Sequence, residues 1–242
     1  MNLLALLSSM PLESDQILSR LKYVRSARIA RKTVYKGKLQ GIDVILLNSG
    51  IGKVNAAHSA TCIVEHFPVK SIINIGVGGA YPNSGLNIGD IAVASKEIYG
   101  DDGVITSKGW ESLKKIGIPL VRTGNRRYFN EFPVHKKLPP RLIKTGRWDF
   151  KIRSGNFITV SATTGTHKRA VELEESFNAL CENMEGAAIA HVCTIYKIPM
   201  LEIRGISNMA GVRDKRKWNL KLASENCQKF TLEVLSRAGR KR

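Results

Sequence analysis

The segment CENMEGAAIAHVC, from Cys181 to Cys193, places two carboxylates at the start of a predicted helix that otherwise consists of small and apolar residues. Glu182 and Glu185 are three residues apart, so a helix running through both would carry them on one face. A carboxylate at the start of such a helix either caps the helix N-terminus or is directed at a ligand. The segment alone leaves both interpretations open.

Two glycine-rich loops, NSGIGKVNAA (48–57) and GVGGAY (76–81), invite a nucleotide-phosphate interpretation because glycine lets backbone N–H groups approach a ligand. The first fails the P-loop pattern, since its Gly-Lys pair is followed by Val54 rather than Ser or Thr. The second has Tyr81 where a dinucleotide fingerprint requires its third glycine. The loops therefore support neither ATP nor NAD. Both follow predicted strands, whose carboxyl ends are ligand-binding positions in open α/β sheets, and tight turns without a ligand are the alternative.

Five segments occur in an order that resembles the nucleoside phosphorylase and nucleosidase superfamily: SSMPLESD, SGIGK, NIGVGGAYP, ENMEGAAIAHVC and IPMLEIRGISNMAGVRDKRKW. Together they cover the chain from end to end. MEGAAIAHVC looks like the methylthioadenosine nucleosidase branch. RGISN followed by GVRD and Trp218 looks more like the futalosine hydrolase branch, which releases hypoxanthine from futalosine in a menaquinone pathway. The resemblance implies cleavage of an N-ribosidic bond without a metal or another cofactor.

Cleavage of an N-ribosidic bond turns the sugar into an oxocarbenium-like cation. The site therefore needs negative charge near the ribose, an activated water and a hydrogen bond to the departing purine. By the resemblance, Glu13 deprotonates the water, Arg204 helps to hold the water and the carboxylates, and Glu185 binds the ribose hydroxyls. The structural alternatives are a helix first-turn carboxylate for Glu13 and a surface ion pair between Arg204 and Glu202.

The resemblance also places five residues around the substrate. Met184 would lie against the sugar, although a Met at a helix start is also an ordinary packing residue. Phe157 would stack on the purine, and Val77 and Gly78 of the second glycine loop would line the substrate. Arg213 would pair with the benzoate at the far end of futalosine or order the loop that covers it, and a solvated loop is the alternative.

Asn208 distinguishes two branches of the family. In nucleosidases that act on 6-aminopurines this position is an Asp, which donates to N7 when protonated and accepts from the amino group when ionised. An Asn keeps a fixed donor for the N7 and O6 acceptors of hypoxanthine, so we expect a 6-oxopurine and, with it, futalosine. Val77, where the methylthioadenosine branch has a Ser, favours the same choice. A methylthioadenosine/adenosylhomocysteine nucleosidase and a purine nucleoside phosphorylase are the alternatives.

The elements that must position these residues alternate between short β-rich runs and longer helical patterns. This alternation predicts a three-layer αβα fold with a central mixed, largely parallel sheet. We expect one domain over residues 1–242, because no repeat or linker divides the chain, and we assign no structure to most of residues 101–153. The expected strands are 3–8, 42–48, 71–75, 90–94, 157–161 and 200–206, and the expected helices are 13–25, 53–65, 168–177, 185–196 and 217–237.

The composition adds a strong positive charge, since 38 Lys and Arg against 20 Asp and Glu give +18. A nucleic-acid or polyanion binder has such a charge and is the alternative from a different functional class. No zinc finger, RRM signature or basic zipper accompanies the charge, so we expect a solvated basic surface and no nucleic-acid partner.

The four cysteines are widely scattered and form no Cys-x-x-Cys pair, which predicts reduced, mostly buried thiols in a cytoplasmic protein. The apolar start of the chain lacks the positive n-region of a signal peptide and predicts a strand. No continuous run of apolar residues is long enough to span a membrane. By the resemblance, the partners are a small nucleoside and further copies of the chain, in a homodimer or a larger homo-oligomer.

Overall fold

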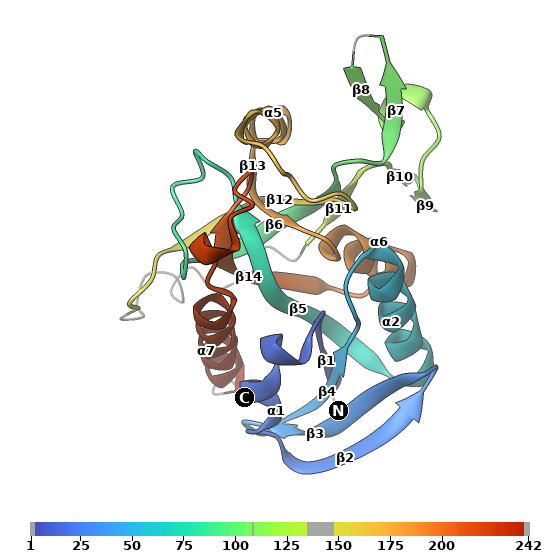
Figure 1. Cartoon of the computed structure of the whole chain (residues 1–242). Coiled ribbons are helices and arrows are strands. Elements are labelled where there is room, and N and C mark those ends of the chain that lie inside the picture. The colour runs from blue at the N-terminus through green and yellow to red at the C-terminus, as the bar shows by residue number, and fades with distance from the viewer. Residues whose placement is uncertain (1–2, 108, 135–147, 240–242) are drawn as a thin grey trace.

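A ten-stranded mixed sheet runs through the residues that the computed structural model describes, which are 3–107, 109–134 and 148–239 (Figure 1). The strand order is β11-β6-β12-β13-β5-β1-β4-β3-β2, and β14 pairs with both β5 and β6. Five of these pairings are parallel and five are antiparallel, so the expected mixed sheet is confirmed although parallel pairs do not predominate. The strands are β1 (Leu3–Ser8), β2 (Lys22–Ile29), β3 (Lys32–Leu39), β4 (Ile42–Asn48), β5 (Val69–Ala80), β6 (Ile91–Tyr99), β11 (Glu131–Pro133), β12 (Ile152–Thr159), β13 (Ala179–Asn183) and β14 (Met200–Met209).

Helices cover both faces of the sheet, which confirms the three-layer αβα arrangement (Figure 1). On one face, α2 (Lys53–His66) packs against α6 (Gly186–Tyr196) over a core of small and branched side chains. On the other face lie the short α1 (Asp15–Leu18) and the long α7 (Leu220–Gly239), which buries Phe230 against the strands. The remaining helical elements are η1 (Pro11–Glu13), α3 (Leu113–Ile116), α5 (His167–Phe177) and η2 (Lys215–Lys217).

Five strands close into a ring within the sheet. β6 pairs with β12, β12 with β13, β13 with β5, β5 with β14, and β14 with β6 again. This closure brings together residues from five separate parts of the sequence.

The expected helix over residues 13–25 is wrong. Only α1 forms there, and the chain then enters β2, an edge strand whose residues are exposed up to its last. An exposed strand shows no alternation of apolar and polar residues, so its sequence carries no strand signal. Ala30 and Arg31, both with positive φ (46° and 64°), make the two-residue turn into β3 without the glycine that usually marks such a turn.

Residues 101–153, which the sequence left unassigned, contain two small hairpins and one strand of the main sheet. β7 (Gly103–Thr106) pairs with β8 (Gly109–Ser112), β9 (Val121–Thr123) pairs with β10 (Arg126–Tyr128), and β11 joins β6. Most of the basic segment 141–153 lies outside the described residues. The four cysteines are buried and free, as expected. No helix in the described part of the chain is long and apolar enough to cross a membrane.

Candidate active site

A cavity of about 150 Å³ lies where β1, β5 and β14 end and α6 begins. Eight of the nine residues expected at the site line it, although they come from segments as far apart as residues 13 and 213. They are Glu13, Val77, Gly78, Met184, Glu185, Arg204, Asn208 and Arg213. Phe157 does not line it, because its side chain is fully buried in the core under α6. Phe157 is therefore a packing residue, and the expected stack on the purine is wrong.

Glu13 is held by three backbone N–H groups at the end of β1. Its Oε2 accepts from the N–H groups of Ser9 and Met10 at 2.8 Å each, and its Oε1 accepts from that of Val77 at 2.9 Å. Burial raises the pKa of Glu13 above its ordinary value of 4.5, and the positive charge of Arg204 only partly opposes this. A buried carboxylate with a pKa raised toward neutrality has the property of a general base.

The first turn of α6 is capped by residues other than Glu185. Asn183 Oδ1 accepts the N–H groups of Glu185 and Gly186 at 2.9 and 2.7 Å. Thr159 Oγ1 accepts that of Ala187 at 2.7 Å. The carboxylate of Glu185 makes no capping bond, so the cap interpretation of this residue is wrong.

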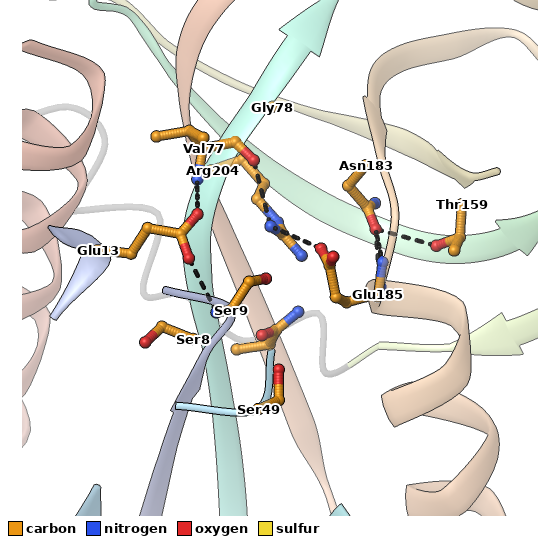
Figure 2. A network of polar contacts seen from close by, with 12 residues as sticks. Ser8, Ser9, Glu13, Ser49, Val77, Gly78, Thr159, Asn183, Glu185 and Arg204 are labelled. Atoms are coloured by element: carbon orange, nitrogen blue, oxygen red, sulfur yellow. Dashed lines mark hydrogen bonds and ion pairs between the residues drawn. The ribbon is translucent and has the colours of Figure 1, made fainter. Parts of the chain in front are cut away.

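The carboxylate of Glu185 instead faces Arg204 and the first glycine loop. Its Oε2 lies 3.4 Å from Nη1 of Arg204, and its Oε1 accepts the N–H of Gly52 at 2.9 Å. Figure 2 shows Glu13 and Glu185 on opposite sides of the Arg204 guanidinium. The structure thus brings the two predicted carboxylates and the predicted arginine into one cluster.

Arg204 is fully enclosed. Its Nε donates to Oε1 of Glu202 at 2.8 Å and its Nη1 donates to the carbonyl of Val77 at 3.1 Å, whereas Nη2 has no partner among the described residues. Burial alone would lower the pKa of Arg204, but the carboxylates of Glu202, Glu185 and Glu13 raise it above its ordinary value. The expected ion pair with Glu202 exists, but it is buried rather than at the surface.

Gly76 allows Glu13 and Arg204 to approach each other. A Cβ at this position would lie 2.6 Å from Oε1 of Glu13 and 2.8 Å from Nη1 of Arg204. Any side chain here would therefore displace one of the two charged groups.

Asn208 presents an N–H₂ group at the cavity. Its Oδ1 accepts from the hydroxyl of Ser207 at 2.8 Å, and its Nδ2 lies 3.1 Å from the carbonyl of Met209. The hydroxyl of Ser207, which also lies 3.3 Å from the carbonyl of Gly78, takes up one lone pair of the amide oxygen, and one N–H of the amide remains for a ligand.

Glu182 is a residue whose place the sequence did not predict correctly. It lies in β13 rather than on the helix of Glu185, and its Oε1 accepts the N–H of Thr164 at 2.9 Å. Its Oε2 accepts from the hydroxyls of Tyr81, at 3.1 Å, and of Thr164. Glu182 therefore anchors the loop after β12, and both Glu182 and Thr164 line the cavity.

Arg213 lies at the exposed edge of the cavity. Its guanidinium is 4.8 Å from the ring centre of Trp218, and its Nη1 lies 3.3 Å from Oγ1 of Thr163. These contacts orient a cation beside the opening without burying it.

The charges around the cavity are mainly negative. Glu13, Glu182 and Glu185 line it together with two guanidiniums, one of which, Arg204, is already shared among carboxylates. Such a site stabilises a ligand that becomes cationic in the transition state.

The chain is similar to known proteins in both sequence and fold. A family model described as the phosphorylase superfamily matches residues 3–236. A futalosine hydrolase of Thermus thermophilus is 34% identical over 201 residues, covering 83% of this chain and 85% of the relative. A 5'-methylthioadenosine/S-adenosylhomocysteine nucleosidase of a Geobacillus species is 32% identical over 211 residues, covering 86% of each chain. The crystal structure of such a nucleosidase from Colwellia psychrerythraea, in complex with adenine, superimposes with a TM-score of 0.82 at 26% identity, covering 98% of this chain and 95% of the other.

Proposed function

The chain belongs to the phosphorylase superfamily and is related to its nucleosidases, and on that premise we propose that it hydrolyses the N-ribosidic bond of futalosine and releases hypoxanthine. Both futalosine hydrolase and methylthioadenosine/adenosylhomocysteine nucleosidase occur among the similar proteins, so the choice of substrate depends on the residues of this cavity.

In the proposed reaction, Glu13 takes a proton from the attacking water as the bond between the anomeric carbon and the purine breaks. Its position between three backbone N–H groups fixes the carboxylate, and its raised pKa makes it a stronger base than an exposed glutamate. Glu185 accepts hydrogen bonds from the ribose hydroxyls, and its negative charge favours the oxocarbenium-like sugar. The electron pair of the broken bond passes to the purine, which takes up one proton from water and leaves as the neutral base, and Glu13 returns its proton to the solvent.

The observation that carries the choice of purine is the hydrogen bond from Ser207 to the amide oxygen of Asn208. This bond and the contact of Nδ2 with Met209 orient the amide, and its free N–H acts toward a ligand as a donor. N7 and O6 of a 6-oxopurine are acceptors and match it. The exocyclic amino group of a 6-aminopurine would instead meet a second donor, which is costly in a buried site.

The charge around the cavity favours hydrolysis over phosphorolysis. A phosphorylase must hold an inorganic phosphate beside the sugar, whereas here Glu13, Glu185 and Glu202 share the positive charge of Arg204. A phosphate placed in this cluster would meet carboxylates on two sides, so water is the better nucleophile.

Arg213 supports futalosine as the particular 6-oxopurine nucleoside. Its guanidinium is oriented by Trp218 and Thr163 at the edge of the cavity, where the end of the substrate remote from the purine would emerge. A guanidinium in this place would pair with the benzoate of futalosine.

The test is incubation of the purified protein with futalosine, inosine and methylthioadenosine, each with and without inorganic phosphate. We expect free hypoxanthine and an unphosphorylated sugar from futalosine at a rate that does not depend on phosphate. A requirement for phosphate would identify a phosphorylase, and adenine released from methylthioadenosine in preference to hypoxanthine would contradict the proposed substrate.

A further inference from the structure

We propose that Glu97 and Glu202 form a buried pair of carboxyl groups that shares one proton and positions both Arg204 and Glu185 for the cleavage step. Both are positioning residues, because neither lines the cavity. This inference rests on the proposed N-ribosidic cleavage but not on the identity of the nucleoside.

The two side chains meet inside the ring of five strands. Glu97 comes from β6 and Glu202 from β14, and both are fully buried. Each of the other three strands of the ring adds one polar partner, namely Asn74 of β5, Thr159 of β12 and Asn183 of β13. Apolar side chains alone could fill the interior of such a ring, so the presence of this polar cluster needs an explanation.

The carboxyl groups face each other across a position where the chain has no side chain. A Cβ at Gly186 would lie 2.1 Å from Oε1 of Glu97 and 2.4 Å from Oε2 of Glu202. Only a glycine at this first residue of α6 therefore leaves room for the two oxygens.

The hydrogen-bond partners require a proton between the two groups. Oε1 of Glu202 accepts from Nε of Arg204 at 2.8 Å and from Nδ2 of Asn74 at 3.0 Å. Oε2 of Glu202 has no donor in the described part of the chain other than the Glu97 carboxyl it contacts. Two ionised carboxylates cannot donate to each other, so the contact is a hydrogen bond only when one of them is protonated.

Glu97 is the group that holds the proton. Burial, and then the neighbouring charge of Glu202, raise the pKa of Glu97 well above its ordinary value. Burial also raises the pKa of Glu202, but Arg204 lies directly against this carboxylate and favours its ionised form, as does the hydrogen bond from Glu97. The other titratable groups near the pair, among the described residues, are Glu185, Tyr99 and the thiols of Cys181 and Cys193. Burial raises the pKa of the phenol and of both thiols, so these three stay neutral.

The pair completes a chain of hydrogen bonds that ends at two groups of the site. Arg204 donates to Glu202, Glu202 accepts from protonated Glu97, and Oε1 of Glu97 accepts from Nδ2 of Asn183 at 2.8 Å. Asn183 in turn accepts the backbone N–H of Glu185. One proton thus holds Arg204 in place, with Nη2 available to a ligand, and fixes the start of α6.

The first test is spectroscopic. Protein labelled with ¹³C at the glutamate side-chain carboxyl is titrated by NMR, and the wild type should show one carboxyl that keeps the chemical shift of the protonated acid at neutral pH. This signal should be absent from Glu97→Gln, which removes the protonated group, and in Glu202→Gln the same carboxyl should ionise at a lower pH, because the neighbouring negative charge is gone. Absence of the signal from the wild type, or its persistence in both variants, would overturn the proposal.

The second test compares two substitutions of one residue. In Glu202→Gln the amide oxygen can still accept from Arg204 and the N–H₂ can donate to Glu97, so the bonds that hold Arg204 are kept. Glu202→Ala removes these bonds and should lower kcat/KM by about 10²-fold, the scale of a 1 Å misplacement of a catalytic group. We expect Glu202→Gln to restore most of this loss, and a folded Glu202→Gln protein as inactive as Glu202→Ala would contradict the positioning role.

A matched control and a second substrate separate this proposal from the proposed function. Glu174 is a buried carboxylate that accepts from the N–H of Asn83 outside the cavity, so Glu174→Gln should change neither the NMR signal nor kcat/KM. The kinetics use whichever of futalosine, inosine or methylthioadenosine the wild type cleaves. A protein that rejects futalosine but shows the shared proton would refute the substrate and leave the pair intact.

Discussion

Replacement of Glu13 by glutamine separates the catalytic role of this carboxylate from its structural role. Glutamine has one carbonyl oxygen, which can replace Oε2 and accept from the N–H groups of Ser9 and Met10. Its N–H₂ group then faces the N–H of Val77, which Oε1 of Glu13 accepts at 2.9 Å. One opposed pair of buried donors costs about 1–3 kcal/mol of folding free energy.

The catalytic loss should be larger than this structural cost. A glutamine cannot take the proton of the attacking water, and removal of a general base lowers kcat by about 10²–10⁴-fold. At about 1.4 kcal/mol for each factor of ten, this corresponds to about 3–6 kcal/mol of lost transition-state stabilisation. The wild type should also lose kcat/KM as the pH falls through the pKa of Glu13, which lies above 4.5, and the variant should lack this acid limb.

The assay is release of free purine at saturating substrate, combined with binding of the substrate to Glu13→Gln by calorimetry. We expect binding close to that of the wild type and turnover at least about 10²-fold lower. Glu174→Gln is the matched control, since it makes the same change at a buried carboxylate that accepts a backbone N–H away from the cavity. A Glu13→Gln protein that turns over at nearly the wild-type rate, or that keeps the acid limb, would refute the assignment of Glu13 as the base.

The remaining predictions concern four other residues. Glu185→Gln should raise KM and lower kcat together, because the carboxylate touches the sugar in the ground state and in the transition state; a variant that changes only in thermal stability would contradict this. Asn208→Asp should weaken futalosine cleavage and raise activity on a 6-amino analogue, most strongly toward acid pH, where the new carboxyl can donate to N7. If the substrate preference of the variant equals that of the wild type from about pH 5 to 8, Asn208 does not determine which purine is cleaved. Arg213→Ala should raise KM for futalosine and spare inosine, whereas an equal loss on both substrates would indicate a loop-folding role. Glu97 should stay protonated in the folded state above the pH at which it ionises in the unfolded chain, so the folded state binds more protons there. The free energy of unfolding should therefore fall as the pH rises from 4.5 toward the raised pKa of Glu97, by at most about 1.4 kcal/mol per pH unit. Urea unfolding across this window should show a smaller decline for Glu97→Gln, and an equal decline in both proteins would refute the buried acid.

The sequence predicts the parts of the fold that depend on local patterns. β1 and β4 have the expected bounds, and α2 and α7 differ from the expected helices by a few residues, because their apolar residues follow a regular period. In the main sheet β2, β3 and β13 were missed. β2 is exposed up to its last residue, and β13 (Ala179–Asn183) lies between the expected helices 168–177 and 185–196, where Glu182 was taken as the start of a helix.

The candidate site was predictable to the extent that single residues match a family pattern. Glu13, Glu185, Arg204 and Asn208 carry such a match, and the cavity contains all four. Phe157 failed because it lies within β12, whereas the residues of this part of the chain that line the cavity, Thr163 and Thr164, come from the loop after the strand.

The residues that position the site could be predicted only in part from the sequence. Asn183, two residues before Glu185, has the residue type of a helix cap and could have been recognised as one. Glu202 and Arg204, two apart in an apolar strand, could have indicated a buried ion pair. Glu97 could not have been paired with Glu202, because their contact depends on the closure of a ring of strands that no local pattern encodes.

The most direct test of the central claim is the ratio of kcat/KM for futalosine to that for methylthioadenosine, measured with both nucleosides competing in one reaction. A cavity that presents a fixed donor to N7 and O6 should favour the 6-oxopurine, by up to about 10⁴-fold where the mispaired donors are fully buried. We predict that hypoxanthine appears first and that adenine appears only after futalosine is consumed. Release of adenine at an equal or higher rate would contradict the account of Asn208 and, with it, the proposed substrate.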